Sequence, residues 1–305
     1  MNNLQISKLI LILGSLLLST ASLAGESKSR FSFDAGIGYL EDSNVGIADL
    51  DTNSGVSDTA TTYDLGLAAR VPLSRRWETR FAYDYSATAY SELSEFDLGL
   101  HHALAGLTWK PGVLDAGINI EKFAATLDGE DYLDMVQVSP SIARLIGNRL
   151  YLRGAFMHAD KRYDTIAGRD ARNQSWRGDM YMLIDNMDQY VAIGIQSGTE
   201  EADDAAFDYE SVRWNMSYGH LLELGSRDLK LKAKLSHEGR SYLNTDESIG
   251  DRRNDKRLRL RLAGDLQLLE HLELAAHIEH SDIRSNLESA ALDKTVYGLA
   301  LRATF

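Results

Sequence analysis

The chain has 305 residues and a formal net charge of -13, and it contains 24 glycines, 14 tyrosines, 3 prolines and no cysteine. The lack of cysteine rules out disulfides, thiolate metal sites, thiol catalysis and a lipidated cysteine, and the acidic balance argues against a nucleic-acid partner. No stretch of ~20 apolar residues follows the amino terminus, which excludes a membrane protein built from helices. A membrane protein built from strands is still allowed, because only every second residue of a strand need be apolar.

The first 24 residues have the features of a secretory signal peptide. Lys8 is the lone charge, 9–18 is an apolar run too short to span a membrane, and 22–24 (Ser-Leu-Ala) fits a cleavage site with small flanking residues. A membrane anchor is the alternative, and the short run disfavours it. We therefore predict a cleaved signal at 1–24 and a mature chain of 25–305, more negative by the one charge of Lys8.

From residue 31 onward, apolar and polar residues alternate with the period of a strand that has one apolar face. The pattern predicts about fourteen strands, centred on 31–39, 63–71, 77–85, 96–109, 114–121, 136–142, 149–158, 174–184, 191–195, 212–218, 229–235, 257–262, 272–279 and 297–305. The alternation blurs at His101 and His102, which suggests a bulge. Pro140 removes a ladder donor and predicts local strain or a second bulge.

The expected connections alternate in length. The even-numbered ones are short: 74–75, 110–112, 147–148, 186–188, 221–227 and 269–270. The odd-numbered ones are mostly longer and polar: 42–60, 88–94, 126–131, 160–172, 198–207, 239–254 and 282–292. This parity, with both termini on the short side, is the layout of an outer-membrane β-barrel with short periplasmic turns and longer outer loops. A soluble β-sandwich, the alternative fold, has no reason to keep it.

The alternation also predicts which side chains face lipid. A cationic side chain on a lipid face would cost ~2–4 kcal/mol near the middle of the membrane. We therefore expect the basic residues of two neighbouring strands to point into the lumen: Lys230, Lys232, Lys234, Arg257, Arg259 and Arg261. Aromatic residues near strand ends fit the girdles at the two membrane interfaces: Tyr39, Trp77, Trp176, Trp214, Tyr297 and Phe305.

The last strand resembles the closing strand of bacterial outer-membrane β-barrels, which typically ends in an aromatic residue. Its apolar face consists of Tyr297, Leu299, Leu301 and Phe305. Such a strand pairs with the first one and removes the free edges of the sheet. We expect it to be the segment that the barrel-assembly machinery recognises, and we expect outer-membrane lipid and lipopolysaccharide around the barrel.

Several of the eight histidines lie near acidic residues, but none lies in a recognisable catalytic or metal-binding motif. The pairings are His277 with Glu273 and Glu279, His237 with Glu238, and His158 with Asp160. A barrel hydrolase would need a nucleophile or an activated water beside a histidine that an acid orients, and no serine has such a context. We expect polar residues of an ion-paired lumen, with no catalytic residue, metal or cofactor; a barrel enzyme is the alternative.

The inward charges are the best functional feature of the sequence. Acidic residues gather on the first five expected strands, and Asp97, Asp115 and Glu121 belong to the fourth and fifth. In a ring of about fourteen strands these lie opposite the basic strands, to which Arg213 on the preceding strand adds a cation. An open lumen with one basic and one acidic wall could order and select charged solutes. The pattern predicts an outer-membrane channel for small hydrophilic solutes, anions being one candidate class, unless Glu273 and Glu279 pair with the arginines and plug the lumen.

A short motif ends the first expected strand. Residues 38–45 read Gly-Tyr-Leu-Glu-Asp-Ser-Asn-Val, and this segment resembles the one that opens the barrel in the surface lipoprotein assembly modifier family. The resemblance implies a fourteen-strand barrel with a role in moving lipoproteins to the cell surface, so an accessory barrel for the export or assembly of lipoproteins or polysaccharide is a second interpretation. The helical-repeat domain of that family is missing here, and 42–44 could equally form a simple turn at the rim.

Overall fold

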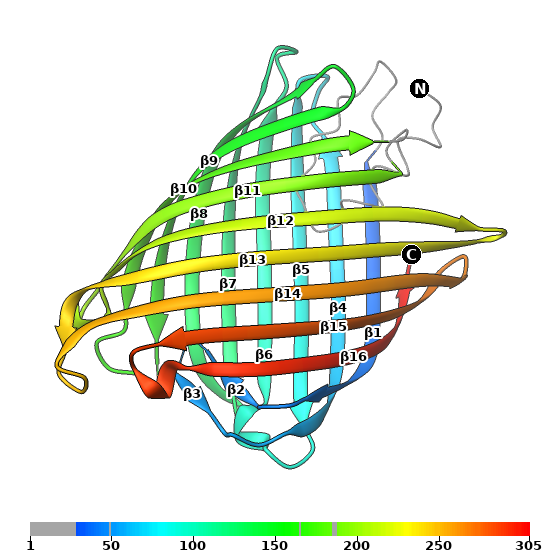
Figure 1. Cartoon of the computed structure of the whole chain (residues 1–305). Coiled ribbons are helices and arrows are strands. Elements are labelled where there is room, and N and C mark those ends of the chain that lie inside the picture. The colour runs from blue at the N-terminus through cyan, green and yellow to red at the C-terminus, as the bar shows by residue number, and fades with distance from the viewer. Residues whose placement is uncertain (1–28, 49, 165, 185–187) are drawn as a thin grey trace.

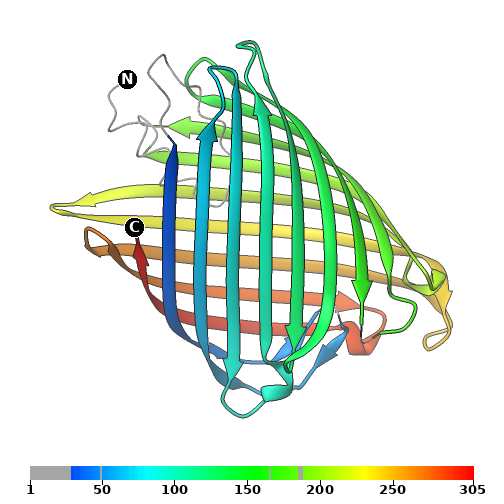
Figure 2. The same cartoon turned by 180° about the vertical axis from the view of Figure 1, so that it is seen from behind.

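The computed structural model describes residues 29–48, 50–164, 166–184 and 188–305. The predicted signal peptide lies outside these residues. Fourteen antiparallel strands close into one barrel, which confirms the predicted fold class (Figures 1 and 2). The strands are β1 Arg30–Asp42, β4 Asp58–Pro72, β5 Trp77–Tyr90, β6 Leu98–Trp109, β7 Asp115–Leu127, β8 Glu130–Ile146, β9 Leu150–Tyr163, β10 Ala171–Ile184, β11 Gln189–Ala202, β12 Tyr209–Leu224, β13 Arg227–Asp246, β14 Asp251–Leu269, β15 Leu272–Ser285 and β16 Leu292–Thr304.

The barrel closes between its first and last strands, as the sequence predicts. β16 pairs with β1 from Asp34 opposite Thr304 to Asp42 opposite Val296. Beyond this ladder, Phe33 and Phe305 exchange two backbone hydrogen bonds of 3.0 and 2.8 Å, and their rings stack with centroids 6.3 Å apart. No strand edge of the barrel is left open along this seam, which is the condition for a sheet surrounded by hydrocarbon.

The outer surface of the barrel is apolar. Large apolar side chains alternate along the strands and stay exposed, which a water-soluble protein would avoid over so wide an area. Examples from three strands are Ile193, Ile195, Leu258, Leu260, Leu262, Tyr297, Leu299, Leu301 and Phe305. The aromatic residues expected in the girdles are exposed as well: Tyr39, Trp77, Trp176 and Trp214. The outer face is therefore suited to lipid.

Within the described residues, no helix is long and apolar enough to cross a membrane.

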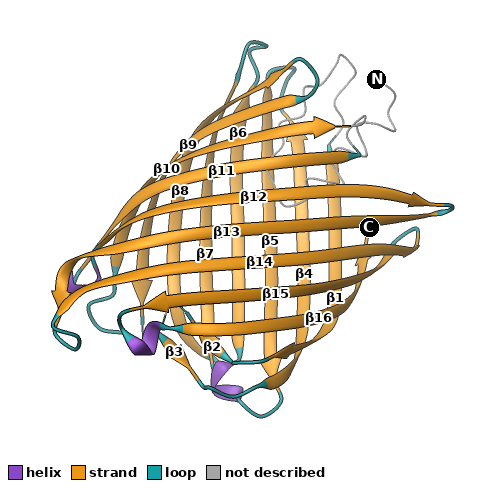
Figure 3. Cartoon of the chain, viewed as in Figure 1, coloured by secondary structure: helices purple, strands orange, loops and turns teal. Residues whose placement is uncertain are grey.

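The two ends of the barrel differ as predicted. The three described 3-10 helices and the hairpin of β2 (Gly46–Ile47) and β3 (Thr52–Asn53) gather at the end away from the C-terminus (Figure 3). The helices are η1 Ser94–Phe96, η3 Ala205–Phe207 and η4 Glu288–Ala290. We call this the outer end, following the layout of outer-membrane barrels.

Several predicted connections are shorter than expected, and three of them are reduced to turns of two to four residues. The expected loop 126–131 is a two-residue turn in which Asp128 and Gly129 both have positive φ, 53° and 80°, as a tight hairpin requires. The expected loop 239–254 shrinks to 247–250, and 221–227 shrinks to 225–226. At 239–254 the strands continue with polar residues on both faces, because a strand that projects beyond the membrane no longer needs an apolar side.

Neither predicted bulge is found. β6 keeps its register with both neighbours through His101 and His102, because the two rings simply occupy opposite faces of the strand. The ladder between β8 and β9 is interrupted at Pro140, with no change of register across the gap. The observed register shifts lie between Ala125 and Thr126, between Ser241 and Thr245, and between Gln267 and Leu269.

Candidate functional site

The basic residues of β13 and β14 lie side by side on the face opposite the exposed leucines. The register pairs Lys234 with Arg261 and Lys230 with Asp265. The Lys230 ammonium also reaches Glu273 on β15, across β14. Because the alternating residues Leu258, Leu260 and Leu262 occupy the outer surface, these charged side chains line the interior of the barrel.

Acidic partners neutralise part of this basic surface. Lys232 lies 3.5 Å from Asp265, and Arg257 lies 3.3 Å from the fully buried Asp255. Glu279 contacts both remaining arginines of the set: its oxygens lie 3.3 Å from Arg259 and 3.1 Å from Arg261. Glu279 therefore pairs with arginines, as the plugged-lumen alternative expected, whereas Glu273 pairs with a lysine.

A group of cations remains exposed to the interior. The Arg259 side chain is 58% exposed in spite of its contact with Glu279, and Arg213 is 44% exposed although it donates a 2.6 Å hydrogen bond to Glu238. Lys234 is exposed as well and interacts electrostatically with both. Arg177 on β10, which also acts on Lys234, is 29% exposed and donates hydrogen bonds of 2.9 and 3.0 Å to the buried Asp179. We call Arg177, Arg213, Lys234 and Arg259 the cation cluster.

The opposite wall is mixed in charge. β6 and β7 lie seven strands away from β13 and β14 in the ring. Glu121 on β7 accepts a 2.7 Å hydrogen bond from Gln137, and its other oxygen lies 3.6 Å from His102, which in turn lies 3.3 Å from Asp84. Carboxylates do gather here, as the sequence indicates.

Two acidic candidates have surroundings that the sequence did not suggest. Asp115 lines a recess together with Arg70, Arg80 and Arg153, so the acidic wall also contains cations. The sequence could have indicated these arginines, because they occupy inward positions in the same alternation as the acidic residues. Asp97 does not belong to a strand: it precedes β6, where its carboxylate accepts a 2.7 Å hydrogen bond from the backbone N–H of Tyr90. Asp97 therefore holds a loop at the outer rim.

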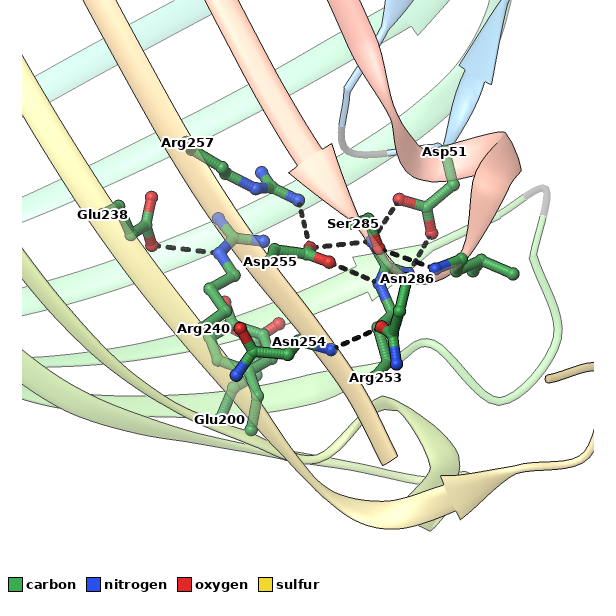
Figure 4. A network of polar contacts seen from close by, with 12 residues as sticks. Asp51, Glu200, Glu238, Arg240, Arg253, Asn254, Asp255, Arg257, Ser285 and Asn286 are labelled. Carbon is green, nitrogen blue, oxygen red and sulfur yellow. Dashed lines mark hydrogen bonds and ion pairs between the residues drawn. The ribbon is translucent and has the colours of Figure 1, made fainter. Parts of the chain in front are cut away.

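A buried network joins the first outer connection to the barrel wall (Figure 4). Asp51, between β2 and β3, accepts two hydrogen bonds of 2.7 Å from the guanidinium of Arg253 on β14. The same guanidinium donates two bonds of 2.9 Å to Asp255, and Arg169, from the connection between β9 and β10, lies 3.6 Å from Asp51. Charge-assisted bidentate pairs of this kind are strong and directional. We call the Asp51–Arg253 contact the latch.

The motif at 38–45 fastens the start of the same connection. The buried Asp42 carboxylate accepts hydrogen bonds from the Asn44 N–H (3.1 Å), the Tyr90 hydroxyl (3.2 Å) and the Lys294 ammonium (2.8 Å). The Ser43 hydroxyl accepts a 2.8 Å bond from the N–H of Thr295 on β16. These side chains thus form a turn at the rim, one of the two readings that the sequence allowed.

Two of the histidine–acid pairs of the sequence, His237 with Glu238 and His158 with Asp160, are not arranged as catalytic sets. The ring of His237 stacks on Trp214 on the outer face, with centroids 5.8 Å apart, while Glu238 points inward to Arg213. His158 lies 3.7 Å from Asp160, which Arg172 also contacts. Among the described residues, no group of three histidine or acidic side chains is placed to hold a metal ion.

Solved structures share this architecture. No family model matches the chain, and no curated protein matches it. An anion-selective porin from Comamonas acidovorans superimposes with a TM-score of 0.54 at 10% identity, over 92% of this chain and 100% of that one. The loop L8 deletion mutant of OmpT, an outer membrane protein of Vibrio cholerae, gives 0.50 at 7% identity, over 91% and 99%. The chain has the fold of a bacterial outer-membrane β-barrel. At such identities the likeness extends to the fold alone.

Proposed function

We propose that the protein is an outer-membrane channel for small hydrophilic solutes with a preference for anions. The observation that carries this proposal is the cation cluster, whose four members lie on β10, β12, β13 and β14. They face the interior because the residues that alternate with them along these strands, such as Trp176, Trp214 and Leu260, are exposed on the outer surface. In a narrow polar lumen with low-dielectric walls, such a group attracts anions and repels cations over several ångströms. The Comamonas porin, which shares the fold, is described as anion-selective.

The test is single-channel recording in a planar bilayer with a salt gradient across it. The refolded mature chain should give stable open steps and a reversal potential that reports anion preference. Reversing two inward charges, Lys232→Glu with Arg259→Glu, should move the reversal potential toward cation preference, because four units of charge change inside the lumen. Arg284→Glu is the matched control: its side chain is 79% exposed beside Asp282, on the outer side of β15.

Two results would count against the proposal. Unchanged selectivity in the double variant would remove Lys232 and Arg259 from the conduction path. A silent bilayer, with folding verified by heat-modifiable gel mobility, would mean that ion pairs such as those of Glu279 close the lumen. In that case the protein would not be a channel.

A second candidate is the accessory role in lipoprotein or polysaccharide export that the 38–45 resemblance implies. The supporting observation is that this segment organises the outer mouth, since Asp42 binds both β5 and β16. Co-expression with a surface lipoprotein tests it: Asp42→Ala should lower the amount exposed on the cell surface without changing total lipoprotein. Equal surface exposure with and without the barrel would exclude this role.

Partners of the outer face follow from the same fold. We infer that β16 is the segment read by the barrel-assembly machinery and that the aromatic residues of the outer end contact lipopolysaccharide. The exposed faces of Tyr297 and Trp176 support the second inference, because amphipathic rings favour the interface between headgroups and hydrocarbon. A catalytic role is not proposed.

A further inference from the structure

A polar recess lies inside the outer end of the barrel, between β9 and β13. Its cavity is about 200 Å³, somewhat larger than the ~150 Å³ space that accommodates a benzene-sized ligand. It therefore has room for one six-membered ring and not for a longer chain. We call it the outer recess; its charged and hydroxyl-bearing walls include Lys161, Arg169, Glu200, Tyr209, Arg213 and Arg240.

Positive charge prevails around the outer recess. Four of its lining residues are cations and one, Glu200, is an acid. Two further carboxylates contact these cations from the surroundings: Glu238 binds Arg213 and Arg240, and Asp51 lies 3.6 Å from Arg169. With both counted, one positive charge is left uncompensated. A single anionic group would balance it.

Aromatic rings hold the guanidinium groups in position. Arg169 lies over the ring of Phe207, 5.1 Å from its centroid, and within 5.8 Å of the Tyr163 centroid. Arg240 lies 4.8 Å above Tyr209. Cation–π contacts of this kind fix the plane of an arginine while its N–H groups stay able to donate at the edge. Preformed, oriented donors are what recognition of a planar carboxylate requires.

Glu200 supplies an acceptor on the floor of the outer recess. It is 8% exposed, and three donors converge on its Oε2: Lys161 at 2.6 Å, Asn173 at 3.1 Å and the Tyr209 hydroxyl at 3.0 Å. None of these three bonds uses Oε1. A carboxylate oxygen outside these bonds can accept from a ligand that brings its own hydroxyl groups.

We propose that the outer recess binds a single sugar-acid unit, a six-membered ring with one carboxylate and several hydroxyls. Arg169 and Arg213 engage the carboxylate, and Glu200 accepts from a hydroxyl. This inference names the solute class of the proposed channel and rests on that function for its biological use. Arg213 also belongs to the cation cluster, so a solute that leaves the recess meets Lys234 and Arg259 next.

Binding can be measured without any passage through the lumen. Isothermal titration of D-galacturonate into the refolded mature protein in detergent micelles should give saturable heat, and neutral D-galactose should give none at equal concentration. Arg213→Gln and Arg169→Gln should each weaken galacturonate binding about tenfold or more, the loss expected for one hydrogen bond to a charged group. Arg284→Gln removes the same charge outside the barrel and should leave the affinity unchanged.

The outcomes separate this inference from the proposed function. Equal heats for the two sugars on the unmodified protein would overturn the sugar-acid site even if no variant folds. An equal loss in Arg284→Gln would show that net charge, and not the outer recess, attracts the acid. Galacturonate binding without any conductance in the bilayer would support the site and exclude the channel. Conductance without galacturonate binding would support the channel and exclude the site.

Discussion

We predict that the latch, the ion pair between Asp51 and Arg253, holds the connection between β1 and β4 against the barrel wall. Asp51→Asn keeps the shape of the side chain and removes its charge, so that Arg253 loses a bidentate partner at 2.7 Å. Both side chains are largely buried, with exposures of 11% and 3%, so water screens the pair little. A hydrogen bond to a charged group contributes ~1.5–3 kcal/mol. The released state of the connection should therefore become roughly 10- to 100-fold more populated.

Limited proteolysis measures that population. Chymotrypsin cleaves after leucine, and Leu50 adjoins the latch; cleavage there needs local release of the segment, so its rate follows the released fraction. Because Asp51→Asn also alters the residue after the cut, Arg253→Gln serves as a second variant that breaks the same contact and keeps the cleavage sequence. Both should raise the rate of cleavage after Leu50, identified by mass spectrometry of the fragments.

The matched control is Asp134→Asn on β8. Its carboxylate forms an ion pair of 2.7 Å with Lys122 on β7, and these two strands carry neither residue of the latch. The substitution removes the same charge and should leave cleavage after Leu50 unchanged. If both latch variants cleave within twofold of the unmodified protein, the ion pair does not hold the connection.

Two further predictions concern the barrel itself. Deleting Phe305 removes the stacked ring and both backbone bonds to Phe33, and it should slow closure of the barrel, seen as a delayed heat-modifiable band during refolding into vesicles. Gly219→Ala should lower the free energy of unfolding by ~1–3 kcal/mol in urea titrations, because its new Cβ would lie 2.0 Å from the Tyr190 ring. Gly178→Ala, where the nearest atom is 3.8 Å away, should change it little; equal losses would show that the clash is not the cause.

The alternation of residues made most of the architecture predictable. The inner face was predictable from Lys230, Lys232 and Lys234, because placing three charges in lipid would cost too much free energy. The outer face was predictable from Leu258, Leu260 and Leu262. The same signal failed at 239–254, where the strands leave the membrane and water reaches both faces. A pattern that exists only because of lipid cannot mark the part of a strand that lies beyond it.

The sequence predicted which charged residues line the lumen, but not which of them form ion pairs with one another. Glu279 was recognised as a partner for arginines because it lies on the adjacent strand. The contact between Lys230 and Glu273 crosses β14, and the one between Asp51 and Arg253 joins residues 202 positions apart. No periodicity connects such residues, since their meeting depends on how the barrel curves and where a loop folds. The outer recess was missed for the same reason, because its walls come from four strands and two connections.

The seam between β1 and β16 has a consequence for the order of folding. In the described barrel every other ladder joins consecutive strands of the barrel, with only the small β2–β3 hairpin between β1 and β4, so each can form locally at small entropic cost. The seam alone joins the two ends, and contacts of such long sequence separation form slowly. Until the final residues arrive, two unpaired strand edges stay open to aggregation. The lifetime of this open state is thus set by the rate at which one ladder forms.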